Sequence, residues 1–297
     1  MREVFSPLAC ALTTLVPMEK VEQQKALAAA VSAARAVGKL MRANLCAAKT
    51  VNLSTQHDIK LELDVSSQKL IEKKLSATFP EIALLGEEGV AGDANAGYRW
   101  VVDPIDGTVN FAYGIPHACV SIALQARSPK SKVQSPKSSA RQRVTSHTSH
   151  VTLLGVVYDP FTDELWTAIR GQSARLNGRV IQVSRRRKLS ETIVSMGFAK
   201  TRESLELTLP YFSQVVRRVR KVRVMGSAAL ALTYVATGRF DAYIERGISL
   251  WDIAAGGLIV ECAGGEFWRE PISGEHKFRM VASNGLLRRD LRVPRAW

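Results

Sequence analysis

The chain has 297 residues, with 41 Lys and Arg against 27 Asp and Glu, so its formal net charge at pH 7 is +14. Hydrophobic residues make up 46% of it and charged residues 23%, which is typical of globular proteins and argues against a low-complexity or disordered chain. The charge makes nucleic acid, a membrane surface or an anionic metabolite the first partners to consider.

The positive charge is concentrated in three short runs. Residues 127–150 contain six Lys and Arg with no Asp or Glu, residues 185–188 contain four, and residues 217–223 contain five. The rest of the chain is close to neutral. A nucleic-acid partner therefore depends on these runs, and the first of them lacks the interleaved aromatic side chains that stack on bases.

The four cysteines, Cys10, Cys46, Cys119 and Cys262, show no short spacing, which disfavours a zinc site or a disulfide framework and favours a cytoplasmic location. We expect no membrane association, because no apolar run reaches the roughly 18 residues of a spanning helix. Residues 1–20 are predicted to be a flexible tail. Their apolar stretch 8–16 leaves organellar targeting open.

In the first half of the chain, apolar residues at three- and four-residue steps predict a helix over 21–47. Asp64 stands where an N-cap would, ahead of a second helix that must end near Pro80. Short strands are predicted at 82–85, 100–102 and 117–125. We interpret 127–150 as a mobile insertion between paired strands, because so long a loop is unusual inside a compact domain.

The second half begins with a strand pair, 153–158 and 165–169, joined by a turn at 159–163, and another tight turn is predicted at Asn177-Gly178. Strands and helices then alternate. The strands are expected at 193–196, 222–225 and 241–245, the helices at 205–220, 227–237 and 251–262, and two final strands at 266–268 and 278–282. This alternation is typical of α/β proteins.

Two carboxylates, Asp103 and Asp106, follow directly on an apolar strand. Pro104 stiffens the turn between them, Gly107 allows close backbone approach, and the carbonyl of Ile105 can point the same way. Such oxygen ligands select Mg²⁺ rather than zinc. The alternative is an ordinary turn, because Asp, Pro and Gly favour turns for backbone reasons alone.

Further carboxylates stand at the ends of other buried elements. Glu87 and Glu88 end the strand 82–85, and Asp252 lies in the first turn of an apolar helix. Carboxylates gathered in this way would repel one another, and bound divalent cations are the usual remedy. These residues therefore favour the metal site over the ordinary turn.

Four separated motifs, DIKLELD at 58–64, GEEG at 86–89, DPIDGTVNF at 103–111 and WDIAAGG at 251–257, resemble the inositol monophosphatase family of Mg²⁺-dependent, lithium-sensitive phosphatases. The resemblance spans roughly residues 21–285. It implies the five-layer αβαβα sandwich of the inositol monophosphatase and fructose-1,6-bisphosphatase type within residues 21–297. An antiparallel sheet is expected in 21–150, an α/β half in 151–297, the metals at their junction, and a homodimer.

The resemblance also implies the roles of individual residues. One Mg²⁺ would be held by Glu87, Asp103 and the Ile105 carbonyl, and a second by Asp103, Asp106 and Asp252. Whether the site binds a third Mg²⁺ stays open, because Leu61 stands where the family usually has Thr. The catalytic residues would be Glu87 with Thr108 and Asp64, which activate the water. The substrate contacts would be Asp106, Gly107, Thr108, Ala228, Glu245 and Asp252.

The function implied is a phosphomonoesterase that acts on myo-inositol monophosphate, of the inositol 1-phosphate type, or on a related small polyol or sugar phosphate, by direct attack of a metal-activated water. Three other activities of the superfamily stay open: 3'-phosphoadenosine nucleotidase, fructose-1,6-bisphosphatase and histidinol phosphatase. A weakly catalytic, RNA-binding or regulatory member is the second hypothesis. The alternative interpretation of Glu245 is a solvated loop carboxylate that pairs with Arg246. His57 and His117 are interpreted as structural or surface residues.

Overall fold

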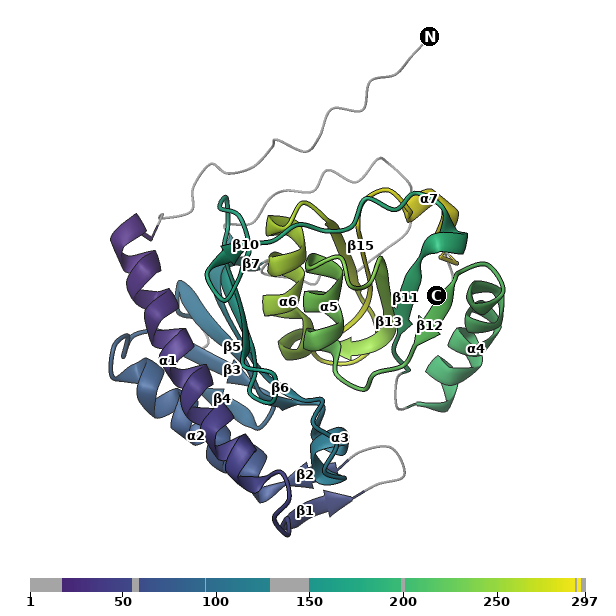
Figure 1. Cartoon of the computed structure of the whole chain (residues 1–297). Helices are drawn as coiled ribbons and strands as arrows, with labels where there is room; N and C mark the ends of the chain where they lie inside the picture. Colours follow the sequence, from purple (N-terminus) through teal and green to yellow (C-terminus); the bar gives the residue numbers. More distant parts are fainter. Residues whose placement is uncertain are drawn as a thin grey trace, which may run out of the picture.

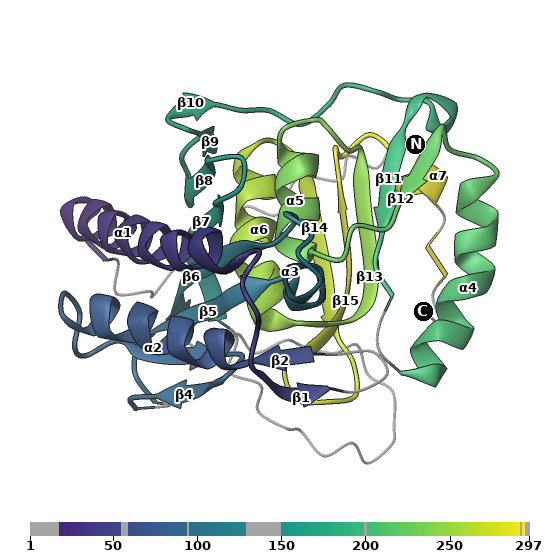
Figure 2. The same ribbon diagram turned by 60° about the horizontal axis from the view of Figure 1, so that its bottom comes forward.

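The computed structural model describes residues 18–54, 59–93, 95–128, 150–198, 201–291 and 293–294, arranged in five layers (Figure 1). Helices α1 (Lys20–Asn44) and α2 (Glu62–Ser76) cover one face of an eight-stranded sheet. Its other face packs on α5 (Ala228–Ala236) and α6 (Leu250–Cys262), which also contact a five-stranded sheet. The outermost layer contains α4 (Arg202–Val216), as Figure 2 shows. The predicted αβαβα sandwich is confirmed.

The eight-stranded sheet has the order β10-β9-β8-β7-β6-β5-β3-β4, and all its neighbours are antiparallel except β3 and β5. Its strands are β3 (Ala83–Gly86), β4 (Gly89–Ala91), β5 (Tyr98–Asp106), β6 (Cys119–Arg127), β7 (His150–Asp159), β8 (Glu164–Ile169), β9 (Arg175–Leu176) and β10 (Arg179–Val180). The sheet therefore continues well past residue 150.

Both turns predicted in this sheet are confirmed. Asp159 pairs with Glu164 across the first turn, between β7 and β8. At the second turn, between β9 and β10, Asn177 and Gly178 have φ of 48° and 81°. Positive φ at both central residues is typical of the type I′ hairpin turn.

The long basic segment joins two neighbouring strands, as predicted. Arg127 at the end of β6 pairs with His150 at the start of β7 in an antiparallel register. Most of the insertion, residues 129–149, lies outside the described residues, as do His57 and the first 17 residues of the predicted tail.

The five-stranded sheet has the order β12-β11-β13-β15-β14. Its strands are β11 (Ile193–Met196), β12 (Lys221–Arg223), β13 (Ala242–Ser249), β14 (Glu266–Pro271) and β15 (Lys277–Ser283). β11 runs parallel to β12 and β13, whereas β15 is antiparallel to β13 and β14. The predicted α/β alternation is confirmed. β13, however, runs on to Ser249, so Glu245 lies inside a strand and not at the start of a loop.

The sequence pattern missed several short elements. β1 (Val51–Ser54) pairs with β2 (Ile59–Leu61), and others are a 3₁₀ turn at Leu189–Glu191 and α7 (Arg288–Leu291). The short helix α3 (Thr108–Ala112) follows β5. Such short segments carry too few residues for a periodic pattern to show. Among the described residues, no helix combines the length and hydropathy needed to cross a membrane.

Three apolar cores lie between the layers. One joins α1 and α2 to the larger sheet around Trp100 and Tyr158, and another lies against α4 around Tyr211. The central core surrounds α5 and α6 and includes Leu232 and Ile253. These two helices are apolar all round because both of their faces are covered by sheets.

Candidate active site

Asp103 and Asp106 lie within the last residues of β5, and not after a shorter strand as predicted. The pairing of β5 with β6 is irregular between these two residues, which turns both carboxylates toward one site. The Asp103 carboxylate accepts a hydrogen bond from the Ile105 amide at 3.0 Å. Gly107 follows with φ of 94°, and a side chain there would meet the His117 carbonyl at 2.9 Å. The motif therefore needs glycine at this position.

The third carboxylate, Asp252, comes from the opposite side of the site, on the first turn of α6. Its side chain accepts a hydrogen bond from the amide of the N-cap residue Ser249 at 2.9 Å. This bond holds the carboxylate at the helix N-terminus. One oxygen from each of Asp103, Asp106 and Asp252 lies within 4.8 Å of the others, and we call these three residues the carboxylate cluster.

Asp106 is held by the N-terminus of α5. It accepts hydrogen bonds from the Ser227 hydroxyl at 2.5 Å and from the amides of Ala229 at 2.7 Å and Ala228 at 3.2 Å. Sequence reasoning assigned Ala228 to the substrate and gave Ser227 no role. The signal was nevertheless present, because a serine directly before an apolar helical run is a typical N-cap.

Burial makes the carboxylate cluster electrostatically unfavourable by itself. It raises the pKa of Asp103 well above its usual range and that of Asp252 to about 8, and the neighbouring carboxylates raise both further. Burial also raises the pKa of Asp106, against the opposing effect of the Ser227 and α5 amide donors. None of the ion pairs among the described residues involves these three side chains.

The cluster fits hard divalent cations. All its donors are carboxylate oxygens, which Mg²⁺ prefers, and with one oxygen from each residue within 4.8 Å of the others they are close enough to share an ion. Positive charge at this point would let the buried carboxylates ionise. The residues present therefore fit the expected metal.

Glu87 lies in the turn after β3, with its amide donating to the Val102 carbonyl at 3.2 Å. Its charge contributes to the raised pKa values of Asp103, Asp252 and Asp64, so it faces the same site from a third element. Its neighbour Glu88 pairs instead with Lys60 at 3.1 Å.

Asp64 was expected as an N-cap, but α2 begins at Glu62, so Asp64 is the third residue of the helix. Its Oδ2 accepts the Leu61 amide at 2.8 Å, and its buried Oδ1 has no hydrogen-bond partner among the described residues. Burial raises the pKa of Asp64 to about 7, and the charges of Glu87 and Glu88 add to the rise. A neutral or proton-accepting carboxyl at pH 7 is suited to proton transfer.

The Thr108 hydroxyl donates to the Ile105 carbonyl at 2.9 Å. Its expected pairing with Asp64 is not formed in this structure and stays a prediction. The Ile105 carbonyl, an expected metal ligand, therefore already accepts one hydrogen bond in this structure.

Glu245 is buried, with 8% of its surface exposed, which contradicts the alternative of a solvated carboxylate. Its side chain accepts a hydrogen bond from the Tyr243 hydroxyl and packs against Gly197, where any side chain would overlap it. The charges of Glu245, Asp106 and Asp252 all raise the pKa of Tyr243, so Glu245 and the carboxylate cluster lie in one neighbourhood. Sequence reasoning missed Tyr243 and Gly197.

His117 is consistent with a structural role. Its ring lies edge-on to Tyr234, with 6.1 Å between the centroids, and burial lowers its pKa.

The fold matches solved structures of inositol monophosphatases and of suhB proteins. The structure of inositol monophosphatase from Anabaena (Nostoc) sp. PCC 7120 matches with a TM-score of 0.72 at 32% identity, over 93% of this chain and all of that one. The extragenic suppressor protein suhB of Bartonella henselae matches with a TM-score of 0.76 at 31% identity, over 90% and 96% of the two chains.

Residues 22–130 and 146–286 match the inositol monophosphatase family, and the chain belongs to it. Among its relatives, the inositol-1-monophosphatase of Rhizobium meliloti is 36% identical over 76% of this chain and 77% of its own length. The Nus factor SuhB of Xylella fastidiosa is 36% identical over 82% and 81%.

Proposed function

We propose that this protein is a Mg²⁺-dependent phosphomonoesterase that hydrolyses myo-inositol monophosphate or a related small polyol or sugar phosphate. The observation that carries the proposal is the convergence of Asp103, Asp106 and Asp252, from β5 and α6, on one point, with Asp103 and Asp106 buried and Asp252 partly buried. Family membership and a relative named inositol-1-monophosphatase support the same activity.

Two ions would be held by the carboxylate cluster together with Glu87 and the Ile105 carbonyl. When bound, they would stabilise charge on the phosphoryl group and lower the pKa of a water. The backbone amides of Gly107 and Thr108, at the start of α3, would bind phosphate oxygens. The partnerless oxygen of Asp64 would accept the proton lost by the attacking water through the Thr108 hydroxyl. Buried Glu245, directed by Tyr243, would bind substrate hydroxyls.

The test is phosphate release from a panel of inositol, sugar, nucleotide and histidinol phosphates, with Mg²⁺ and then with Li⁺ added. Asp252→Asn and Asp106→Asn should each reduce kcat/KM more than about a hundredfold. Mutation of a residue that only supports a metal ligand already reduces metal affinity or activity about 10- to 100-fold, and loss of a direct ligand should cost more. The exposed Asp290→Asn is the matched control and should retain activity. Activity without divalent cations, or activity unchanged in Asp106→Asn, would refute the mechanism.

The same panel decides among the alternatives. Preference for a 3'-phosphoadenosine nucleotide, fructose 1,6-bisphosphate or histidinol phosphate would change the proposed substrate but leave the proposed metal site unchanged. A weakly catalytic regulatory member is the second candidate, and it is favoured by the relatives named Nus factor SuhB. The complete carboxylate cluster favours catalysis, because a binding role does not require it.

Inhibition by Li⁺, a homodimeric state and a cytoplasmic location belong to the same proposal. Light scattering of the purified full chain tests the dimer, and the Li⁺ arm of the phosphate-release assay tests the inhibition.

A further inference from the structure

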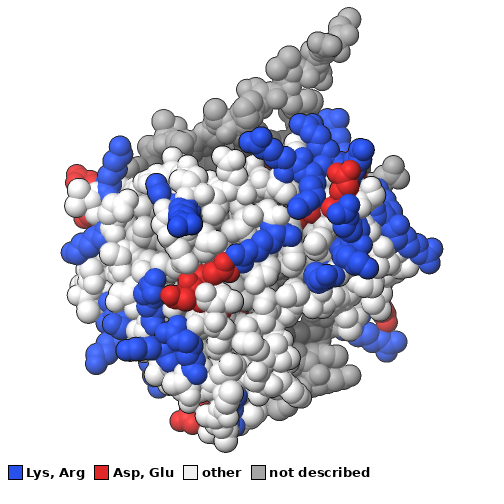
Figure 3. Space-filling model, in the orientation of Figure 1, with Lys and Arg blue, Asp and Glu red and all other residues white. Residues whose placement is uncertain are grey.

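Two of the basic runs, far apart in the sequence, meet at one edge of the five-stranded sheet. Residues 185–188 lead into β11, and residues 217–223 contain β12, the parallel neighbour of β11. The amides of Arg220 and Lys221 donate to the carbonyl of Thr192 at 3.0 and 3.3 Å, a single 3₁₀ turn after Lys188. Figure 3 shows Lys and Arg gathered over this region, where Figure 1 places β11, β12 and α7.

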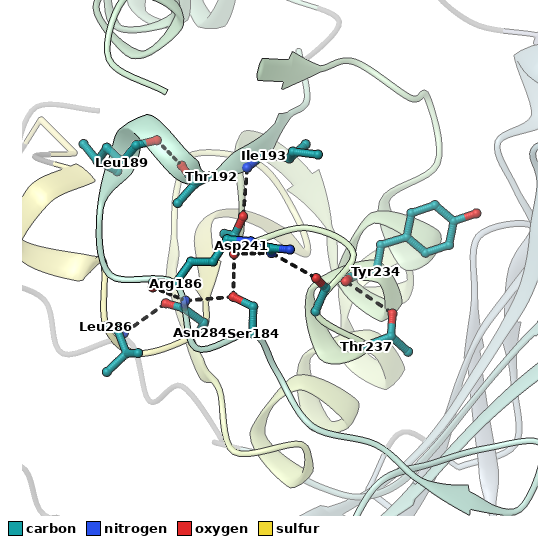
Figure 4. A network of polar contacts seen from close by, with 11 residues as sticks. Ser184, Arg186, Leu189, Thr192, Ile193, Tyr234, Thr237, Asp241, Asn284 and Leu286 are labelled. Atoms are coloured by element: carbon teal, nitrogen blue, oxygen red, sulfur yellow. Dashed lines mark hydrogen bonds and ion pairs between the residues drawn. The ribbon is translucent and has the colours of Figure 1, made fainter. Parts of the chain in front are cut away.

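The segment 185–188 has no regular secondary structure, yet buried polar groups fix its backbone (Figure 4). Asp241 is fully buried and accepts hydrogen bonds from Arg186 Nη1 at 3.0 Å, from the Ile193 amide at 2.8 Å and from the Ser184 hydroxyl. The Asn284 amide group donates to the Arg186 carbonyl at 2.8 Å. Arg186 is therefore structural, and the cations beside it are presented from a rigid loop.

The cations beside Arg186 are available to a ligand. Arg185 and Arg187 are exposed and form no ion pair or side-chain hydrogen bond with any described residue, and the contact of Lys188 with Glu191 is long, at 3.9 Å. The three side chains line an open hollow of about 630 Å³, together with Glu191, Thr237, Gly238 and others, none of them aromatic. Arg185 and Arg187 thus lie unpaired beside a hollow that holds one carboxylate, and such cations are suited to a ligand rich in phosphate.

We propose that this basic edge, defined as Arg185, Arg187, Lys188, Arg220 and Lys221, binds the phosphate backbone of a double-helical nucleic acid. The cations extend beyond the hollow along β12, too widely for a single phosphate ester. Single strands are usually bound on aromatic side chains that stack with bases, and the hollow has none. A duplex keeps its bases stacked inside and presents regularly spaced phosphates, which cations alone can recognise.

The basic edge and the candidate active site lie at opposite ends of the sheet. β11 begins beside the basic edge and ends at Met196, before the Gly197 that packs against Glu245. β13 likewise follows Asp241 and ends at Ser249, the N-cap of α6. At about 3.3 Å per strand residue, even the short β11 separates the two sites by roughly 13 Å. The inference is therefore independent of the proposed phosphatase activity.

The test measures binding of the full chain to a short fluorescent RNA duplex by anisotropy over a series of KCl concentrations. The variant Arg185→Ala/Arg187→Ala/Lys188→Ala should bind about tenfold or more weakly at 0.1 M KCl. The slope of log K against log salt should become shallower by about 0.9 for each phosphate that the variant no longer neutralises. The control Lys39→Ala/Lys69→Ala/Lys73→Ala removes the same charge from exposed positions on α1 and α2 and should bind as the wild type does.

Further measurements test which kind of ligand the basic edge binds. A DNA duplex of the same sequence should bind within a few-fold of the RNA duplex, and phosphate release by the triple variant should be unchanged. Arg220→Ala/Lys221→Ala repeats the test on β12 and replaces the triple variant if that one unfolds. The proposal is wrong if the control loses equal affinity, if only deletion of residues 129–149 abolishes binding, if the single strand binds more tightly than the duplex, or if only phosphatidylserine vesicles bind.

Discussion

At the scale of single residues, Asp64 combines two properties that conflict. Its buried Oδ1 has no hydrogen-bond partner among the described residues, which costs stability, and the same atom is the proton acceptor of the proposed mechanism. Strain and unsatisfied groups of this kind are concentrated at functional sites, because function requires an unpaired atom there.

We therefore expect Asp64→Asn to abolish phosphate release while stabilising the metal-free fold at high pH. Burial raises the pKa of Asp64 to about 7, so between about pH 4 and 7 the folded state holds a proton that the unfolded chain releases. The contribution of Asp64 to the free energy of unfolding therefore falls as pH rises through that window, by up to about 4 kcal/mol. Thermal unfolding in EDTA at pH 5 and pH 8 measures the effect.

The matched control for this experiment is Glu62→Gln, an exposed carboxylate on the same first turn of α2 as the buried Asp64. It should leave the pH dependence of unfolding as in the wild type. A difference between Asp64→Asn and the wild type that is equal at pH 5 and pH 8 would contradict the predicted shift.

A second residue-scale prediction concerns Gly197, against which the Glu245 carboxylate packs. Gly197→Ala should displace Glu245 and raise the KM for inositol monophosphate about tenfold, with a smaller change in kcat, because the proposed contact is to substrate hydroxyls. Steady-state kinetics test this. Gly97→Ala, where a side chain meets no atom within 4 Å, should be neutral, and an unchanged KM in Gly197→Ala would remove Glu245 from the substrate site.

At the scale of elements, the position of α6 decides whether the carboxylate cluster forms. The helix packs directly on β7, where a side chain at Gly155 would lie 2.7 Å from the Ala255 carbonyl oxygen. A side chain at Gly256 would lie 2.7 Å from Leu232 of α5, and one at Gly257 would lie 2.5 Å from Phe267 of β14, so α5 and the smaller sheet pack closely on the same helix. Small residues on α6 thus set where Asp252 lies.

Gly155→Ala should push α6 away from the larger sheet. Overpacking of this kind costs about 1–3 kcal/mol, so we expect a lower unfolding midpoint. Because Asp252 moves with the helix, the Mg²⁺ concentration for half-maximal activity should also rise. A variant that loses stability but keeps its Mg²⁺ dependence would contradict this, because the body of α6 would then have moved while its first turn, with Asp252, stayed in place. Gly97→Ala is again the control.

At the scale of the whole molecule, the carboxylate cluster lies where the two sheets approach each other through α5 and α6. The larger sheet contributes two of the carboxylates through β5, helix α6 contributes the third, and burial raises the pKa of all three. A cation bound there would join the larger sheet to the central helix layer. Ligands that bind only the folded state stabilise it by mass action.

Mg²⁺ should therefore raise the unfolding midpoint of the wild type, by an amount equivalent to about 2.7 kcal/mol at a concentration one hundred times the dissociation constant. Asp103→Asn should lose most of this stabilisation, whereas the exposed Asp290→Asn should keep it. Differential scanning calorimetry with and without EDTA measures the effect. Equal stabilisation of all three proteins would show that Mg²⁺ acts elsewhere.

Local patterns were sufficient for most elements of the fold. The three- and four-residue spacing in α1, the Asn177-Gly178 turn and the strand-helix alternation after residue 190 depend on near neighbours in the sequence, and each is confirmed. The end of β5 and the length of β13 were misjudged, because cross-strand pairing extends a strand through polar residues that look like a loop.

The carboxylates were identifiable from the sequence by themselves, because charged side chains beside apolar runs are costly to bury without a partner. Only the tertiary structure decided which of them meet, since Asp103 and Asp252 lie far apart in the chain and are brought together by the packing of α6 on the larger sheet. The same holds for the positive charge. Its amount follows from composition, but the meeting of residues 185–188 with β12 depends on parallel strand pairing, which involves contacts that local sequence does not encode.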